Sequence, residues 1–344
     1  MSSRRTLVLT ASLVAFSASA MAAFTLDASG EENPRLAWLE RFQDSRQGPE
    51  QTETFSATYT LGDDGSLDLT HIAGDIRVTT GRGNQVRIEA IKRVRHRDAA
   101  EAKRLLSALR IEVAQVGGRI EVRTVYPRVT RGFNGSVDYT ITVPQNAALS
   151  LKTVSGDVSV NGVHGEVRAE SVSGDVEVIA TPNLALAKTV SGDVRARDIS
   201  STSLTLGTVS GTVVASGLKV RTLDASSVSG DLQLSNLQVE RLTAKTLSGE
   251  ITFEGSLVRG GRYEFNAHSG DVRLMLTSNT PGFELDASTF SGSVRSDFPV
   301  TLRSTNDGAG RRGSANRALR GTYGDASAIL ALRSFSGSVV ISKH

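Results

Sequence analysis

The chain has 344 residues, of which 39% are hydrophobic and only 5% aromatic, and it contains no cysteine. The lack of cysteine excludes disulfide bridges, thiolate nucleophiles and cysteine-ligated metals. The formal net charge of +3 becomes +1 when the two arginines of residues 1–22, a segment without acids, are subtracted, so the charge does not indicate a nucleic-acid partner.

Residues 1–22 have the pattern of an export signal peptide. Two arginines precede an apolar stretch from Leu7 to Phe16 that is too short to span a bilayer, and Ala20-Met21-Ala22 resembles a cleavage site. We expect cleavage before Ala23 and an exported protein, periplasmic or at the cell surface, with no transmembrane segment in the mature chain. A retained anchor is the alternative, and both the Sec and the twin-arginine export routes stay open.

Residues 23–52 read as a polar linker with a short capping helix. Asn33-Pro34 can start this helix, and Leu36, Leu39 and Phe42 give it an apolar side. We expect it to cover an open end of the domain that follows, or to be a loose linker. The alternative is a helix that docks on a partner or a membrane.

The main domain is expected over 53–344 and starts with alternating strands up to residue 91. The pattern then predicts a helix from Asp98 to Arg110, with Asp98 and Glu101 forming a capping box and Leu105, Leu106 and Leu109 on its buried side. Further strands follow, and Pro144 ends the last of them.

From residue 149 to 344 the chain repeats one phrase: apolar residue, Ser, Gly, small or acidic residue, apolar residue. Its glycines are spaced by 18, 18, 19, 19, 19, 21, 22 and finally 45 residues. Ala73-Gly74-Asp75-Ile76 is a degenerate first copy. The glycines and aspartates of the phrase are Gly156, Asp157, Gly174, Asp175, Gly192, Asp193, Gly211, Gly230, Asp231, Gly249, Gly270, Asp271, Gly292 and Gly337.

Two alternating strands flank each phrase, and a period near 20 residues is typical of a solenoid. Gly permits the bend, while Ser and Asp can satisfy backbone groups there, so these residues form a structural turn ladder along the axis. The sequence therefore predicts an all-β, single-stranded parallel β-helix with one short helix near its N-terminal end. The wider late steps indicate a broader C-terminal core, filled by Phe253, Tyr263, Phe265, Phe283 and Phe290.

The Thr-Val-Ser-Gly-Asp word at 153–157 and 189–193, Val143-Pro144 and the late glycine loop resemble the DUF4097 family of adhesin-like bacterial proteins. This resemblance covers roughly residues 55–344. It implies a right-handed β-helix, a location in the cell envelope, an adhesin-like role without catalysis, and no catalytic motif. The acidic position departs from Asp at Thr212, Glu250, Ser293 and Ser338.

The stacked carboxylates of the phrase have two readings. They could share Ca²⁺, but the repeat lacks the calcium-binding nonapeptide pattern, so we favour Asp bonding within its own turn. The five histidines show no ligand spacing. His268, at an apolar position of the phrase, is expected to be a partly buried spacer. We therefore assign no catalytic residue, metal or cofactor.

Two basic segments are candidate contacts with an anionic partner, and solvated surface is the alternative for both. One is the run from Lys92 to Arg97. The other is an exposed loop over 305–320, which holds Arg311, Arg312, Arg317 and Arg320.

These observations favour an exported, non-enzymatic interaction or structural module of the envelope. Its partner would be an envelope protein or polysaccharide surface, bound on a polar sheet face or the basic loop, and the chain would be a monomer. The alternatives are a β-helix enzyme acting on envelope polysaccharide and a component of an envelope-stress response.

Overall fold

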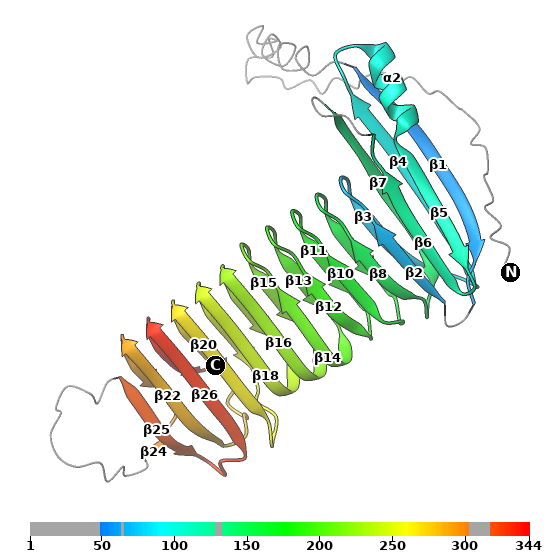
Figure 1. Cartoon of the computed structure of the whole chain (residues 1–344). Coiled ribbons are helices and arrows are strands. Elements are labelled where there is room, and N and C mark those ends of the chain that lie inside the picture. Colours follow the sequence, from blue (N-terminus) through cyan, green and yellow to red (C-terminus); the bar gives the residue numbers. More distant parts are fainter. Residues whose placement is uncertain (1–48, 63–64, 128–132, 303–316) are drawn as a thin grey trace, which may run out of the picture.

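The computed structural model describes residues 49–62, 65–127, 133–302 and 317–344. The expected signal peptide and the expected helix of the linker lie outside these residues. The described chain forms an elongated solenoid in which two long sheets face each other across a continuous core (Figure 1). The predicted β-helical solenoid is confirmed.

One sheet has 13 strands, which in spatial order are β1 (Glu50–Thr60), β4 (Gln85–Arg95), β7 (Asn134–Pro144), β3 (Ile76–Gly81), β9 (Val158–Asn161), β11 (Val176–Ile179), β13 (Val194–Arg197), β15 (Val213–Ser216), β17 (Leu232–Ser235), β19 (Ile251–Gly255), β21 (Val272–Leu276), β27 (Val339–Lys343) and β23 (Val294–Ser296).

The other sheet has 14 strands, which in spatial order are β24 (Thr301–Leu302), β25 (Ala318–Tyr323), β22 (Phe283–Ser291), β26 (Ala328–Ser336), β20 (Arg262–Ser269), β18 (Gln238–Ser248), β16 (Lys219–Ser229), β14 (Ser200–Gly207), β12 (Leu184–Lys188), β10 (Val167–Glu170), β8 (Ala148–Lys152), β2 (Ser66–Thr70), β6 (Arg119–Val125) and β5 (Arg110–Val116).

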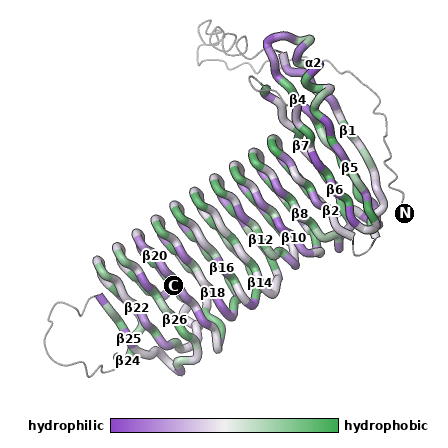
Figure 2. Tube along the Cα trace, viewed as in Figure 1, coloured by the Kyte–Doolittle hydropathy of each residue, from purple (hydrophilic) through white to green (hydrophobic). Residues whose placement is uncertain are grey.

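Each coil consists of one strand of the 14-stranded sheet, a bend and one strand of the 13-stranded sheet. Equivalent residues of neighbouring coils pair in register, so that Val158, Val176 and Val194 form one inward column. All three are fully buried, while the residues between them along each strand face outward. The hydrophobic and hydrophilic segments consequently recur at the same place in successive coils (Figure 2).

The coils do not stack in sequence order at either end. The β2–β3 coil lies between the β6–β7 and β8–β9 coils, and the β26–β27 coil lies between the β20–β21 and β22–β23 coils. A simple solenoid repeat implies that successive windings lie on one another, and this order is found in the middle but not at the ends. The last two glycines of the phrase, Gly292 and Gly337, are 45 residues apart, and this longer connection lets the β26–β27 coil insert between two earlier coils.

Antiparallel strands complete both ends of the solenoid. At the N-terminal end β4 pairs with β1 and β7, and β5 pairs with β6, while β25 pairs with β22 and β24 at the other end. The helix α2 (Ala99–Ala108) lies against β1 and β4 and buries Leu105 and Leu106, as predicted. Asp98 caps it by accepting from the Ala100 amide at 2.8 Å.

Two details of the sequence-based prediction are wrong. Glu101 does not complete a capping box, because its carboxylate binds the Arg104 guanidinium at 2.5 Å. Phe290 does not enter the core, because its side chain is 64% exposed on the outer side of the bend. The other aromatic residues expected there, Phe253, Tyr263, Phe265 and Phe283, are buried.

The bend glycines approach their neighbours so closely that no side chain fits. Their φ angles lie between 121° and 157°, a region that residues with a Cβ rarely adopt. A Cβ added at any of them would also lie 1.9–2.3 Å from a carbonyl oxygen of the neighbouring coil. For Gly156 to Gly337 that oxygen belongs to the glycine of the adjacent coil.

Substitution of a bend glycine should therefore destabilise the folded solenoid. We expect Gly211→Ala to lower the free energy of unfolding by about 3 kcal/mol or more, from backbone strain plus the clash with the Gly192 carbonyl. Gly207 of the same coil is the matched control, since its added Cβ would lie 3.3 Å from the rotatable Ser226 hydroxyl. Chemical denaturation of Gly211→Ala and Gly207→Ala measures the difference, and equal stabilities would contradict the interpretation.

Candidate interaction surfaces

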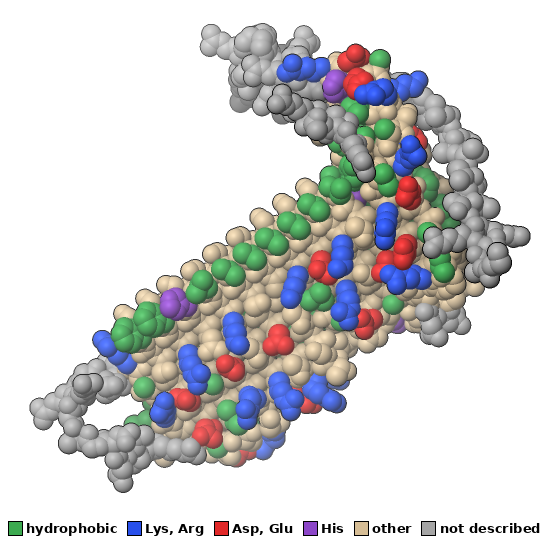
Figure 3. All heavy atoms as spheres, in the orientation of Figure 1, with side chains coloured by type: hydrophobic (Ala, Val, Ile, Leu, Met, Phe, Trp, Pro, Cys, Tyr) green, Lys and Arg blue, Asp and Glu red, His purple; other side chains and the backbone are tan. Residues whose placement is uncertain are grey.

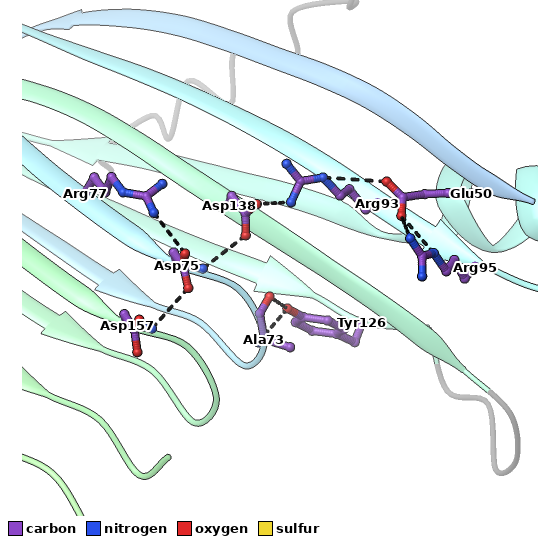
Figure 4. Close-up of polar contacts among 9 residues, drawn as sticks. All are labelled: Glu50, Ala73, Asp75, Arg77, Arg93, Arg95, Tyr126, Asp138 and Asp157. Carbon is purple, nitrogen blue, oxygen red and sulfur yellow. Dashed lines mark hydrogen bonds and ion pairs between the residues drawn. The ribbon is translucent and has the colours of Figure 1, made fainter. Parts of the chain in front are cut away.

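The aspartate of a bend connects one coil to the next. Its Oδ1 accepts the backbone N–H of the equivalent residue in the neighbouring coil, at 2.8 Å for Asp157 with Asp175, for Asp175 with Asp193 and for Asp193 with Thr212. Figure 4 shows the start of this row, where Asp138, Asp75 and Asp157 follow one another. The aspartates thus bind the next coil rather than their own turn.

A second row, of buried hydroxyls, joins the same bends from the inside. Thr189 donates to the carbonyl of Gly174 at 2.8 Å, and Thr208 donates to that of Gly192 at 2.9 Å. Ser171, Ser227, Thr246, Thr289 and Ser334 make equivalent bonds. The sequence carries a signal for this role, because every copy of the phrase except the one with Ala267 has a Thr or Ser two residues before its Ser, on an inward position of the strand.

Arginines two positions further along the coil offset part of the charge of the acidic row. Arg195 binds both Asp175 and Asp193 at 2.6 Å, and Arg273 binds Asp271 at 2.7 Å. Burial raises the pKa of Asp175, but the Asp193 amide and the Arg195 guanidinium outweigh this and lower it overall. Among the described residues, no group of three or more His, Asp or Glu side chains is placed to hold a metal ion.

The first residue of each phrase forms a continuous exposed ridge along the outer corner of the solenoid. These residues are held in line because each following residue pairs with its counterpart in the adjacent coil. The hydrophobic members are 42–64% exposed, and Figure 3 shows them as a green row broken by one histidine. In spatial order the ridge is Ile72, Val154, Val172, Val190, Val209, Val228, Leu247, His268, Phe335 and Phe290.

The C-terminal end of the ridge is a stack of aromatic rings. His268 and Phe290 lie on opposite sides of Phe335, with ring centroids 4.9 Å and 4.8 Å from it and ring planes within 4°. His268 is exposed, so its prediction as a partly buried spacer is wrong. The sequence did contain a signal for the exposed ridge. If the inward and outward alternation of the strand is continued from the inward Leu151, Val154 falls on the outer side, and so do its equivalents in the other coils.

A hollow of about 280 Å³ lies on the outer face of the 14-stranded sheet near its N-terminal end. Side chains of β2, β6 and β8 line it, and they include both positively and negatively charged groups. Arg119 binds Asp68 at 2.8 Å and Glu121 at 3.3 Å, whereas Lys152 binds Glu170 at 3.2 Å. The lining residues are Asp68, Thr70, Arg119, Glu121, Val122, Arg123, Ser150 and Lys152.

The histidine of the first coil is buried beside two tyrosines. Its Nδ1 lies 3.1 Å from the hydroxyl of Thr124, which in turn lies 2.7 Å from that of Tyr139. Nε2 has no hydrogen-bond partner within the described part of the chain. Burial lowers the pKa of His71 from 6.5 to about 4, against smaller raising contributions from the Ala73 backbone and Asp138.

The basic segments singled out in the sequence are largely neutralised where they are described. Lys92 is buried and binds Glu53 at 2.9 Å, and Arg95 binds Glu50 at 2.8 Å (Figure 4). Of the predicted basic loop, Arg311 and Arg312 lie outside the described residues. Arg320 belongs to strand β25 rather than to a loop and binds Asp286 at 2.8 Å, while the backbone carbonyl of Arg317 accepts the Thr289 amide.

The comparisons with known proteins identify the family. A family model described as Toastrack DUF4097 matches residues 65–341. The chain belongs to this family. None of the curated proteins matches it. No helix in the described ranges is long and apolar enough to cross a membrane.

Three of the solved structures that match the chain come from species of Bacteroides and Parabacteroides. An adhesin candidate of Bacteroides fragilis NCTC 9343 is 12% identical with a TM-score of 0.38, and a candidate lipid-binding protein of Parabacteroides distasonis ATCC 8503 is 11% identical with a TM-score of 0.39. Each alignment covers 85% of this chain and 97% of the other. An adhesin candidate of Parabacteroides merdae ATCC 43184 is 9% identical, with a TM-score of 0.32 and coverages of 65% and 89%.

Removal of one ladder carboxylate should weaken the joint between two coils. We expect Asp193→Ala to lower the free energy of unfolding by about 1–2 kcal/mol, because the Thr212 amide loses its acceptor. Asp193→Asn retains a side-chain oxygen and should lose less than half as much. Urea denaturation compares the two, and an alanine variant no less stable than the asparagine variant would contradict this role.

His71 should make the protein less stable in mild acid. Its pKa is about 4 in the folded chain and near 6.5 when exposed, so between these values the unfolded state binds the proton more readily. Stability should fall as the pH drops from 6.5 to 4, by up to about 3 kcal/mol from this residue. Unfolding of the wild type and His71→Gln at pH 7 and pH 4.5 isolates the effect, because the other acid-sensitive groups are shared. An identical pH dependence in both proteins would refute it.

Proposed function

We propose that this chain is an exported, non-enzymatic, adhesin-like module of the bacterial cell envelope, which holds a hydroxyl-rich polymer on the outer face of its 14-stranded sheet. The export proposal rests on the signal-peptide pattern of residues 1–22. The binding proposal rests on one observation, the hollow lined by side chains from three strands.

The chemistry of the hollow suits a polar polymer such as an envelope polysaccharide. Guanidinium and carboxylate groups together donate and accept hydrogen bonds, and Thr70 and Ser150 add hydroxyls. The ion pairs of Arg119 hold its planar donors in place on a sheet rather than on a loop, which lowers the cost of ordering them on binding. Three cations and two carboxylates give the lining a net charge of +1, which favours a neutral or anionic polymer as the ligand.

The same contacts argue for binding rather than turnover. Cleavage of a glycosidic bond requires two carboxyl groups that face the sugar from opposite sides. In the hollow both Asp68 and Glu121 bind Arg119 instead. The aspartates of the bends are likewise committed to amides of the next coil. These groups hold the structure together and can position a ligand.

Removal of the two arginines of the hollow should release the polymer. We expect Arg119→Ala/Arg123→Ala to bind isolated envelope polysaccharide at least about 10-fold more weakly in co-sedimentation, because two sets of charge-assisted hydrogen bonds are lost. Arg221→Ala/Arg241→Ala is the matched control, on the same sheet but outside the hollow, and should bind like the wild type.

The same assay separates binding from catalysis. Equal binding by both variants would place the ligand elsewhere on the molecule. Release of new reducing ends by the wild-type protein, abolished in Asp68→Asn, would show that the chain is an enzyme and would overturn the non-enzymatic proposal.

A further inference from the structure

The side chains of the exposed ridge repeat at a short, regular interval, and few partner surfaces have side chains at the same interval. Its side chains follow one another at the spacing of the coils, about 4.8 Å, so the row is roughly 40 Å long and one residue wide. From the exposed fractions, its side chains leave roughly 700 Å² accessible in total. Single exposed aliphatic residues are ordinary, but an apolar strip of this size, interrupted only by His268, marks an interaction site.

We propose that the ridge packs against the ridge of a second copy, so that two solenoids lie side by side and point in the same direction. The first argument is the repeat itself. A second copy presents branched aliphatic side chains at the same 4.8 Å interval, so each can pack between or beside its counterparts along the whole row, as in interdigitated β interfaces. A partner without this repeat would contact only part of the strip.

The buried area is the second argument. Covering both ridges removes roughly 1,400 Å² from water, which falls within the range of about 1,200–2,000 Å² for stable, specific interfaces. The two rows, together with contacts between the rows that flank them, can therefore supply the area of a dimer of ordinary size.

Charges on either side of the ridge determine the direction of pairing. The row two residues before the ridge has four cations and one glutamate, which give +3: Thr70, Lys152, Glu170, Lys188, Gly207, Ser226, Lys245, Asn266, Arg333 and Ser288. The row three residues after the ridge has seven acids: Asp75, Asp157, Asp175, Asp193, Thr212, Asp231, Glu250, Asp271, Ser338 and Ser293. Arg77, Arg195 and Arg273 offset only part of that charge.

A two-fold axis parallel to the ridge places the basic row of one copy opposite the acidic row of the other on both flanks. A two-fold axis perpendicular to the ridge would oppose like rows, acidic to acidic and basic to basic. Opposed like charges are costly and complementary charges stabilise the correct register. The charge pattern therefore selects the parallel pair, in which each ridge residue faces its own equivalent.

The acidic row also argues against a membrane as the occupant. Insertion of the ridge into an anionic bilayer would bring both flanking rows to the headgroups, and their charges of +3 and −7 sum to −4, which is repelled overall. Pairing differs from the monomer expected from the sequence. It is independent of the polymer site, because the hollow lies on the sheet face, and variants of the hollow should leave it intact.

Charged substitutions on the ridge test the pairing. We expect the purified wild-type protein to sediment as a dimer, and Val172→Asp/Val190→Asp to weaken dimerisation at least about 100-fold, since each new carboxylate faces its own copy across the two-fold axis. Val214→Asp/Val340→Asp is the matched control, with outward valines on the 13-stranded sheet, and should remain a dimer. Val172→Ser/Val190→Ser separates loss of apolar area from repulsion and should weaken the dimer by a smaller factor.

Single cysteines test the direction, because the chain has none of its own. Val154→Cys should form a disulfide-linked dimer under mild oxidation, and so should Leu247→Cys, because every ridge position faces itself in the parallel pair. In an antiparallel pair Val154 would face Phe335, so crosslinking would instead require a mixture of Val154→Cys and Phe335→Cys.

Three results would overturn the proposal. One is a wild-type protein that is monomeric at micromolar concentration, and another is crosslinking only in the mixed cysteine pair. The third is flotation of a monomeric wild type, but not of the Asp variant, with phosphatidylethanolamine–phosphatidylglycerol vesicles, which would identify a membrane as the occupant. In each case the polysaccharide assay of the hollow variants remains an independent test of the proposed function.

Discussion

Close contact between the backbones of stacked bends is the constraint on which this structure depends. Each bend glycine from Gly156 to Gly337 lies where a Cβ would overlap the carbonyl of the glycine in an adjacent coil. That proximity lets the aspartate of one bend reach the amide of the next, and lets a buried hydroxyl reach the glycine carbonyl from inside. Each bend is thus hydrogen-bonded to the adjacent coil on both its inner and its outer side. These bonds fix the register in which the apolar columns of the two sheets stack.

The repeating core could be predicted from the sequence because each element depends on near neighbours. Strand alternation decides which side chain is buried, and the phrase marks the bend, so the inward columns followed from residues a few positions apart. The order of the coils at the ends could not be predicted in this way. The insertion of β26–β27 between two earlier coils depends on the path of a long connection, which leaves no periodic signal.

The surfaces were harder to predict than the core. Phe290 was assigned to the core because it is aromatic, although its place at the head of the phrase puts it on the outside. The hollow combines Asp68, Arg119 and Lys152, which come from strands that are neighbours in space but far apart in the chain. The ridge, by contrast, was encoded in every copy of the phrase, and alternation alone was sufficient to find it.

The different surfaces are compatible with one another. Pairing along the corner leaves the outer face of each 14-stranded sheet accessible, so a parallel pair would present two hollows on one assembly. Two sites on one rigid body bind a long polymer with an effective concentration that a single site lacks. A weak individual contact of the kind that a small, charged hollow offers can then give firm attachment.

The interleaved ends also determine how the molecule responds to mechanical load. A terminal coil of a simple solenoid has one neighbour and peels away from the end. Here β27 runs parallel to β21 on one side and β23 on the other, so tension along it must shear two ladders at once. β3, held between β7 and β9, is in the same position at the opposite end. Such a rod resists unravelling when its two ends are pulled apart.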